Sequence, residues 1–177
     1  MNSHVVIPVL IAFVISLVLG PVVIPFLRRL KMGQTERVEG VQSHLKKAGT
    51  PTMGGIIILA AVVITSLFYV KDYPKVIPVL FLTVGFGLIG FLDDYLKVVM
   101  KRSDGLFPMQ KMALQIVVTA IFAFYIVKVA KIPLTMIVPF SGGYELNLGW
   151  FAIPVLFFAV IGTVNGTNFT DGLGGLA

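Results

Sequence analysis

The sequence predicts an all-α polytopic membrane protein, from its composition and from its long uncharged stretches. Of 177 residues, 57% are hydrophobic and only 12% are charged, whereas about a quarter of the residues in a soluble domain are charged. A helix that crosses the hydrocarbon layer needs about 20 apolar residues. The uncharged stretches therefore predict five transmembrane helices in one domain over residues 1–177, at about 5–27, 53–70, 76–92, 111–128 and 150–167.

Three features exclude other classes of protein. Only Met1-Asn2-Ser3-His4 precedes the first apolar stretch, which is also too long for a cleaved signal peptide. The absence of cysteine excludes disulfide and thiolate chemistry. The net charge of +6 does not indicate nucleic-acid binding, because the cations lie in short segments between apolar helices.

The distribution of these cations predicts the orientation of the chain. Segments 28–52 and 93–111 hold ten lysines and arginines, whereas the other two connections hold four. Because cytoplasmic loops are enriched in Lys and Arg, we expect cytoplasmic loops at 28–52, 93–110 and 168–177 and an outside N-terminus. The outer segment 132–149 has prolines, a glycine pair and alternating apolar residues, which predict a short periplasmic hairpin.

Two adjacent carboxylates, Asp93 and Asp94, follow the third apolar stretch. Such a pair can bind Mg²⁺, which prefers oxygen ligands and is often shared with phosphates, or one carboxylate can act as a general base. The alternative is a pair of solvated acids, with Asp93 paired to Lys97 one helical turn later. The pair alone leaves these interpretations open.

Further polar residues fall on the same predicted side of the membrane. Asn168 and Asp171 are three positions apart and share a face of any helical turn; an amide and a carboxylate suit a ribose, a base edge or a metal-bound water, or simply form a polar turn. Before the second helix, Lys47 and Thr52 offer a cation and a hydroxyl for phosphate, or only the usual positive charge of an inner loop. Lys111 either holds a diphosphate or snorkels to the headgroups.

In combination these segments resemble one family. Gly-Thr-Pro-Thr-Met-Gly-Gly at 49–55 precedes Phe-Leu-Asp-Asp-Tyr-Leu-Lys at 91–97, and Lys-Met-Ala-Leu-Gln at 111–115 precedes Asn-Phe-Thr-Asp-Gly at 168–172. This order is similar to the phospho-N-acetylmuramoyl-pentapeptide-transferases, within the wider superfamily of polyprenyl-phosphate sugar-1-phosphate transferases.

The resemblance implies a bacterial inner-membrane enzyme of peptidoglycan synthesis with a bundle of ten helices, usually a homodimer. It implies UDP-N-acetylmuramoyl-pentapeptide and undecaprenyl phosphate as substrates, lipid I and UMP as products, a cytoplasmic active site and a requirement for Mg²⁺. Carried over by position, the implied catalytic residues are Asp93, Asp94, Lys111 and Asp171, with Asp93 and Asp94 also as metal ligands. Those that line the substrate pocket are Lys47, Thr52 and Asn168.

The sequence departs from the family pattern at two places. Gly174 stands where the family usually has an aspartate that helps to hold the nucleoside, and the chain stops at Ala177, before the family's later aspartate and its histidine-bearing loop. We therefore expect about half of the family's helices here, and no activity from the 177 residues alone. The alternatives are a related transferase for UDP-N-acetylglucosamine and a non-catalytic membrane fragment.

Overall fold

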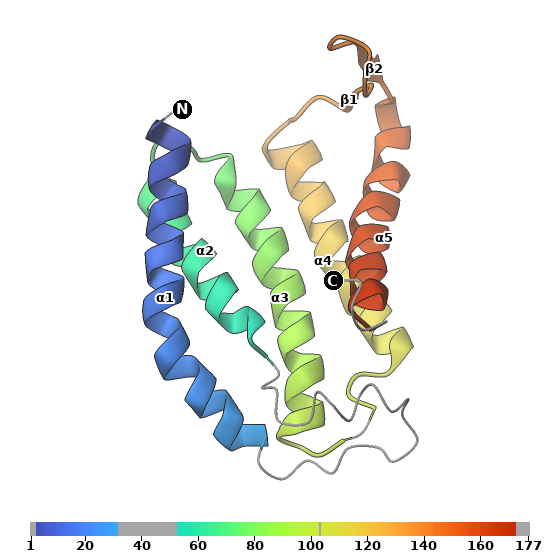
Figure 1. The fold of residues 1–177 in the computed structure, drawn as a ribbon. Coiled ribbons are helices and arrows are strands. Elements are labelled where there is room, and N and C mark those ends of the chain that lie inside the picture. Colours follow the sequence, from blue (N-terminus) through green and yellow to red (C-terminus); the bar gives the residue numbers. More distant parts are fainter. Residues whose placement is uncertain (1–2, 32–52, 103, 173–177) are drawn as a thin grey trace. The chain divides into compact units, whose positions relative to one another are not determined.

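A computed structural model describes residues 3–31, 53–102 and 104–172 (Figure 1). The described residues form five α-helices, which confirms the all-α class: α1 (Ser3–Lys31), α2 (Gly55–Tyr69), α3 (Val76–Val98), α4 (Pro108–Phe124) and α5 (Ala152–Gly172). The chain divides into two compact units, Met1–Lys111 and Met112–Ala177, which are considered one at a time.

Length and composition allow four helical segments of the described part to cross a membrane. These segments are His4–Leu30, Val76–Val98, Pro108–Val129 and Gly149–Thr170. The helix α2 is also apolar but has only 15 residues. Large apolar side chains are exposed on every one of these helices, as expected where lipid or further helices cover them. The chain is therefore a multi-pass membrane protein.

Several helices extend further than the apolar stretches suggest. The structure continues α3 to Val98, whereas the sequence predicts an end near residue 92, so Asp93 and Asp94 lie inside a helix. Likewise α5 continues to Gly172 instead of ending near 167, and α4 begins at Pro108 instead of 111. Apolar runs mark where helices are covered by lipid, but the backbone can remain helical into the polar interface.

In the first unit, α2 runs antiparallel to α1 and α3, so α1 and α3 end on the same side (Figure 1). The helix α2 packs against both neighbours. Gly87 of α3 leaves room for Leu59 of α2, because a Cβ at Gly87 would lie 2.5 Å from the Leu59 Cδ1 atom. A small residue thus permits close contact between two membrane helices, as is common in bilayers.

In the second unit, a short hairpin connects two antiparallel helices (Figure 1). A π-helical segment, Tyr125–Val129, extends α4. Strand β1 (Thr135–Ile137) pairs antiparallel with β2 (Glu145–Asn147), and a 3₁₀ turn at Gly149–Phe151 leads into α5. The hairpin expected within 132–149 is thereby confirmed.

Candidate functional site

The last turns of α3 carry a cluster of charged side chains around Asp93. The Asp93 side chain belongs to a residue only 6% exposed, yet both carboxylate oxygens have partners. The Lys97 ammonium donates to Oδ2 at 2.7 Å, and the backbone N–H of Leu106 donates to Oδ1 at 2.9 Å. The Nζ atom of Lys111 lies 3.8 Å from the same Oδ2. We call Asp93, Asp94, Lys97 and Lys111 the acid–lysine cluster.

The backbone after α3 turns back toward this cluster. Lys101 adopts a left-handed conformation with φ of 52°, and the N–H of Arg102 donates to the carbonyl of Leu96 at 3.0 Å. The left-handed residue and this bond turn the chain back after the end of α3. The Arg102 guanidinium then lies 4.8 Å from the centre of the Phe107 ring, a favourable cation–π contact.

The start of α4 sets the position of Lys111. Pro108 is the first helical residue, where its missing N–H costs nothing. The Gln110 side chain accepts a hydrogen bond from the Phe107 N–H at 3.2 Å, which is one half of a capping box. Lys111 follows within the first turn, and its side chain is 22% exposed. The cap thereby holds the lysine beside Asp93.

Asp94 has a different environment from its neighbour. The residue is half-buried, and it forms no hydrogen bond with the other residues that the structure describes. The carboxylate oxygens of Asp93, by contrast, accept from a lysine and a backbone N–H. The two aspartates are adjacent in sequence but not equivalent in chemistry.

The described residues contain no group of three or more His, Cys, Asp and Glu side chains that would enclose a metal ion. This donor set still suits Mg²⁺, because that ion is usually held by one or two carboxylates, with waters and substrate phosphates as its other ligands. Asp93 and Asp94 are the two carboxylates of the cluster that would supply such ligands.

The second unit contains an uncharged polar pair between its two helices. Gln115 of α4 is 1% exposed, and its Oε1 accepts a hydrogen bond from the Asn165 amide of α5 at 2.7 Å. The Asn165 amide also donates to the Ile161 carbonyl at 2.8 Å. The fully buried Thr119 donates its hydroxyl to the Gln115 carbonyl at 2.7 Å. We call Gln115 and Asn165 the amide pair.

The site residues expected from the sequence have separate outcomes. The structure brings Asp93 and Lys111 together, with Asp94 beside them. Asn168 is exposed on the last turns of α5, and the backbone of Asp171 lies in the same helix. Lys47, Thr52 and Gly174 lie outside the described residues. The interpretation of Asp93 as a partner of Lys97 is confirmed by the 2.7 Å contact.

Two members of the cluster's surroundings were not expected from the sequence: Gly105, which lies against Asp93, and the backbone N–H of Leu106. The dipeptide Asp104-Gly105 is a turn signal in any sequence, and it marks the place where the chain folds back. What the turn approaches, however, is a tertiary feature that local sequence does not encode.

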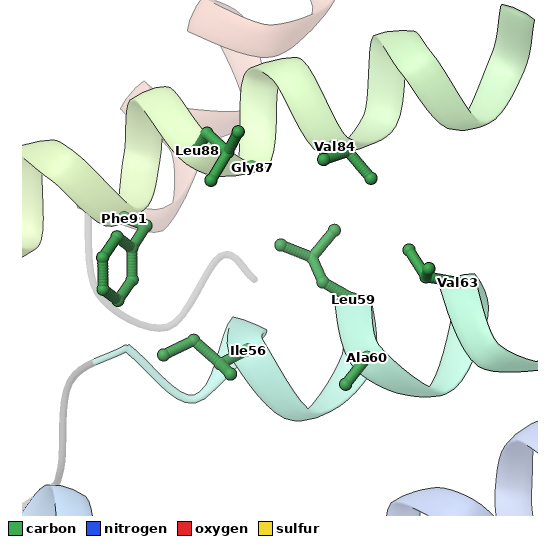
Figure 2. Close-up of a pocket in the computed structure, with 8 residues that line it drawn as sticks. All are labelled: Ile56, Leu59, Ala60, Val63, Val84, Gly87, Leu88 and Phe91. Carbon is green, nitrogen blue, oxygen red and sulfur yellow. The ribbon is translucent and has the colours of Figure 1, made fainter.

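An apolar pocket of about 350 Å³ lies between α2 and α3 (Figure 2). Its walls are aliphatic and aromatic side chains, including Leu59, Val63 and Phe91, and Gly87 of α3 also lines it. With no charged or hydrogen-bonding side chain in its lining, the pocket does not suit a nucleotide or a diphosphate. Among the described residues of the first unit, the acid–lysine cluster differs from this pocket in offering charged side chains.

Carboxylates and lysines gathered at the end of an apolar helix, in a chain of apolar helices long enough to cross a membrane, define a class of protein: a multi-pass membrane protein with a charged cluster at a helix end. The comparison with protein families agrees and is more specific. Residues 76–177 match the model of glycosyl transferase family 4, and the chain belongs to that family. Residues 47–59 match the phospho-N-acetylmuramoyl-pentapeptide-transferase signature 1.

Curated relatives carry the same name as that signature. The chain is 46% identical over 169 residues to the phospho-N-acetylmuramoyl-pentapeptide-transferase of Acetivibrio thermocellus, covering 95% of this chain and 51% of the relative. It is 45% identical to that of Clostridioides difficile and 42% identical to that of Bacillus subtilis, covering 95% of this chain and 52% of each relative. The resemblance found in the sequence is confirmed, and the chain spans about half the length of these relatives.

Proposed function

We propose that this protein transfers phospho-N-acetylmuramoyl-pentapeptide from UDP to undecaprenyl phosphate, releasing UMP and leaving lipid I for peptidoglycan synthesis. The observation that carries the proposal is the acid–lysine cluster, found in a chain 42–46% identical to transferases of that name. Both substrates carry phosphate, and the reaction concentrates their negative charge at one place.

The cluster's residues have distinct roles in this proposal. Lys111 is partly exposed and holds the diphosphate, because an ammonium group offsets phosphate charge as a point charge. Asp93 keeps Lys111 and Lys97 near the reacting phosphates. Asp94 faces the reaction with its carboxylate available, as a metal ligand or as a base toward the acceptor phosphate. Catalysis then consists mainly of positioning and electrostatic stabilisation.

A magnesium ion is part of the proposal, with Asp94 as its main protein ligand and Asp93 as the second acid of the pair. When bound, Mg²⁺ supplies positive charge to the phosphate oxygens during transfer. This role agrees with the donor set described above, in which waters and phosphates complete the coordination.

The nucleotide end of the site draws on other segments. We assign Lys47 and Thr52 to the nucleotide pocket, and the family signature that covers residues 47–59 supports this assignment. Asn168 and Asp171 are assigned to the nucleoside and diphosphate; both belong to the last turns of α5. Asp171 is counted with the catalytic residues.

The location proposed is the bacterial inner membrane, with the site on the cytoplasmic side, the N-terminus outside, and a homodimer as the working form. In the first unit, Arg28 and Arg29 end α1 on the same side as Asp93 and Lys97 of α3 (Figure 1). Because Lys and Arg favour the cytoplasmic side, this sidedness supports the orientation.

The test is a turnover assay on a full-length protein, meaning this chain joined to the half of its curated relatives that it does not span, purified in detergent. Undecaprenyl phosphate and Mg²⁺ are supplied with UDP-N-acetylmuramoyl-pentapeptide, and UMP and lipid-linked product are measured together. We expect equal amounts of both, and no turnover in the presence of excess chelator. A parallel reaction with UDP-N-acetylglucosamine serves as the control for substrate class.

Each outcome decides between the functions considered. Turnover with the muramoyl substrate supports the proposal, and preferred turnover of UDP-N-acetylglucosamine would assign the related transferase activity instead. A folded full-length protein that turns over neither substrate would indicate a non-catalytic membrane protein.

A further inference from the structure

We propose that Gly105 is a positioning residue of the acid–lysine cluster, because its missing side chain lets the turn at Gly105 and Leu106 close on the Asp93 carboxylate. The part of this inference that concerns catalysis rests on the proposed function. The part that concerns structure does not, since it follows from contacts within the first unit.

The contact is close on several sides. A Cβ atom at Gly105 would lie 2.5 Å from Oδ1 of Asp93 and 2.6 Å from Cε of Lys97. It would also lie 3.1 Å from the Asp93 backbone carbonyl oxygen. The Lys97 side chain is 41% exposed and can withdraw, but Oδ1 of Asp93 is held by the Leu106 N–H and the carbonyl belongs to helix α3. Any side chain at position 105 therefore pushes the turn away from Asp93.

The backbone conformation requires glycine as well. Gly105 has φ of 61°, in the left-handed region that glycine adopts without penalty and other residues rarely enter. Its N–H donates to the Arg102 carbonyl at 3.1 Å. This conformation directs the next N–H, that of Leu106, onto Oδ1 of Asp93 at 2.9 Å.

The hydrogen bond fixes the rotation of the Asp93 carboxylate. With Oδ1 held by the Leu106 N–H, the other oxygen, Oδ2, points to the ammonium groups of Lys97 and Lys111. Gly105 therefore acts on the lysines through Asp93, without touching a substrate. Misplacement of a positioned group by about 1 Å can cost on the order of a hundredfold in rate.

The test is a double-mutant cycle on the full-length protein, with Gly105→Ala, Asp93→Ala and the double variant. Trypsin cleavage after Lys101 and Arg102 measures whether the turn has been released, because proteolysis requires local opening. We expect each single variant to be cleaved several-fold faster than the wild type. The double variant should be cleaved no faster than the single variants, since both changes break the same contact.

Two further variants separate the two possible causes of faster cleavage, the steric clash of a Cβ atom and the strained backbone conformation. Gly142→Ala is the matched control, because Gly142 also has positive φ, at 71°, but a Cβ there would meet nothing within 4 Å. It should be cleaved at the wild-type rate. Gly105→Asn tests the clash alone, because asparagine tolerates the left-handed region but still carries a Cβ. It should behave as Gly105→Ala does.

Turnover is the second readout. In Gly105→Ala we expect kcat and kcat/KM for the nucleotide substrate to fall on the order of tenfold to a hundredfold, because Lys111, which holds the diphosphate in the proposed function, is displaced together with Asp93. In the Asp93→Ala background the same change should have little further effect on kcat. A general loss of folding caused by Gly105→Ala would instead lower kcat by the same factor in the wild-type and the Asp93→Ala backgrounds.

The inference and the proposed function fail in different ways. Wild-type cleavage rates for Gly105→Ala or Gly105→Asn, or additive effects in the double variant, would overturn the inference whatever the activity. A wild type that releases no UMP would overturn the proposed function, while the cleavage cycle would still decide whether Gly105 holds the turn on Asp93.

Discussion

The two units of this membrane protein differ in the kind of polar side chain that they place among apolar helices. The acid–lysine cluster uses full charges at the end of α3, where the Lys97 side chain is 41% exposed. The amide pair uses neutral groups between α4 and α5, where Gln115 is 1% exposed. Charges are costly in hydrocarbon and usually serve a function there, whereas neutral amides join helices at lower cost. The two clusters thus differ in charge and in the exposure of their side chains.

This contrast predicts whether each cluster mainly affects turnover or stability. Changes in the acid–lysine cluster should affect turnover more than stability, and changes in the amide pair should affect stability more than turnover. Each variant below tests this contrast, from the largest expected effect to the smallest. An acid–lysine variant that lowers stability more than turnover, or an amide-pair variant that does the reverse, would contradict it.

Asp94→Asn should have the largest effect, a loss of about a hundredfold or more in kcat, because it removes a charge that acts on the transferring phosphate. The thermal midpoint of unfolding should change little, since Asp94 forms no hydrogen bond with the other described residues. Asp72→Asn is the control: Asp72 is an exposed acid between α2 and α3, and its loss should leave turnover unchanged.

Lys111→Met should come next, with a loss on the order of tenfold to a hundredfold in kcat/KM, the usual worth of a hydrogen bond to a charged group. Lys128→Met is a matched control, because Lys128 is an exposed lysine at the other end of the same helical segment. Steady-state assays on both variants would test this. Equal losses would mean that only the overall positive charge matters.

The amide pair should respond in stability. Gln115→Leu leaves the Asn165 amide without its 2.7 Å acceptor, and coupling between such groups in membranes is about 0.6–2 kcal/mol. A cycle with Asn165→Leu, followed by thermal unfolding in detergent, measures this coupling. Thr163→Val, at an exposed position of α5, is the control. A coupling energy of zero would show that the pair does not join the helices.

Lys97→Gln should have the smallest effect. Its side chain is 41% exposed, and without it Asp93 keeps the Leu106 N–H and Lys111 as partners. We expect a slight fall in the unfolding midpoint and at most a few-fold change in kcat. A loss as large as that of Lys111→Met would show that Lys97 contacts a substrate directly.

The sequence predicted the helices and the hairpin well because both depend on local patterns. Uncharged runs located all five helices, and prolines with a glycine pair located the strands. The exact helix ends were missed, since helix can continue past the apolar run, as it does from residue 92 to Val98. Hydropathy measures lipid exposure, and helix ends depend on caps and turns.

The candidate site was predicted only in part. The pairing of Asp93 with Lys97 follows from their spacing on one helix, but the contacts of Asp93 with Leu106 and Lys111 depend on how the intervening turn folds. The amide pair joins residues 50 positions apart. No local sequence pattern encodes these contacts, so the sequence identifies polar residues but not their partners.

The short helix α2 has a consequence for the bilayer itself. Fifteen residues rise only about 22 Å, whereas the hydrocarbon layer is about 30 Å thick. Because α2 packs against both α1 and α3, it is not free to adjust independently of them. Hydrophobic mismatch of this kind thins the surrounding lipid at a cost of fractions of a kcal/mol per Å, so membranes with shorter acyl chains should accommodate this part of the protein more easily than thicker ones.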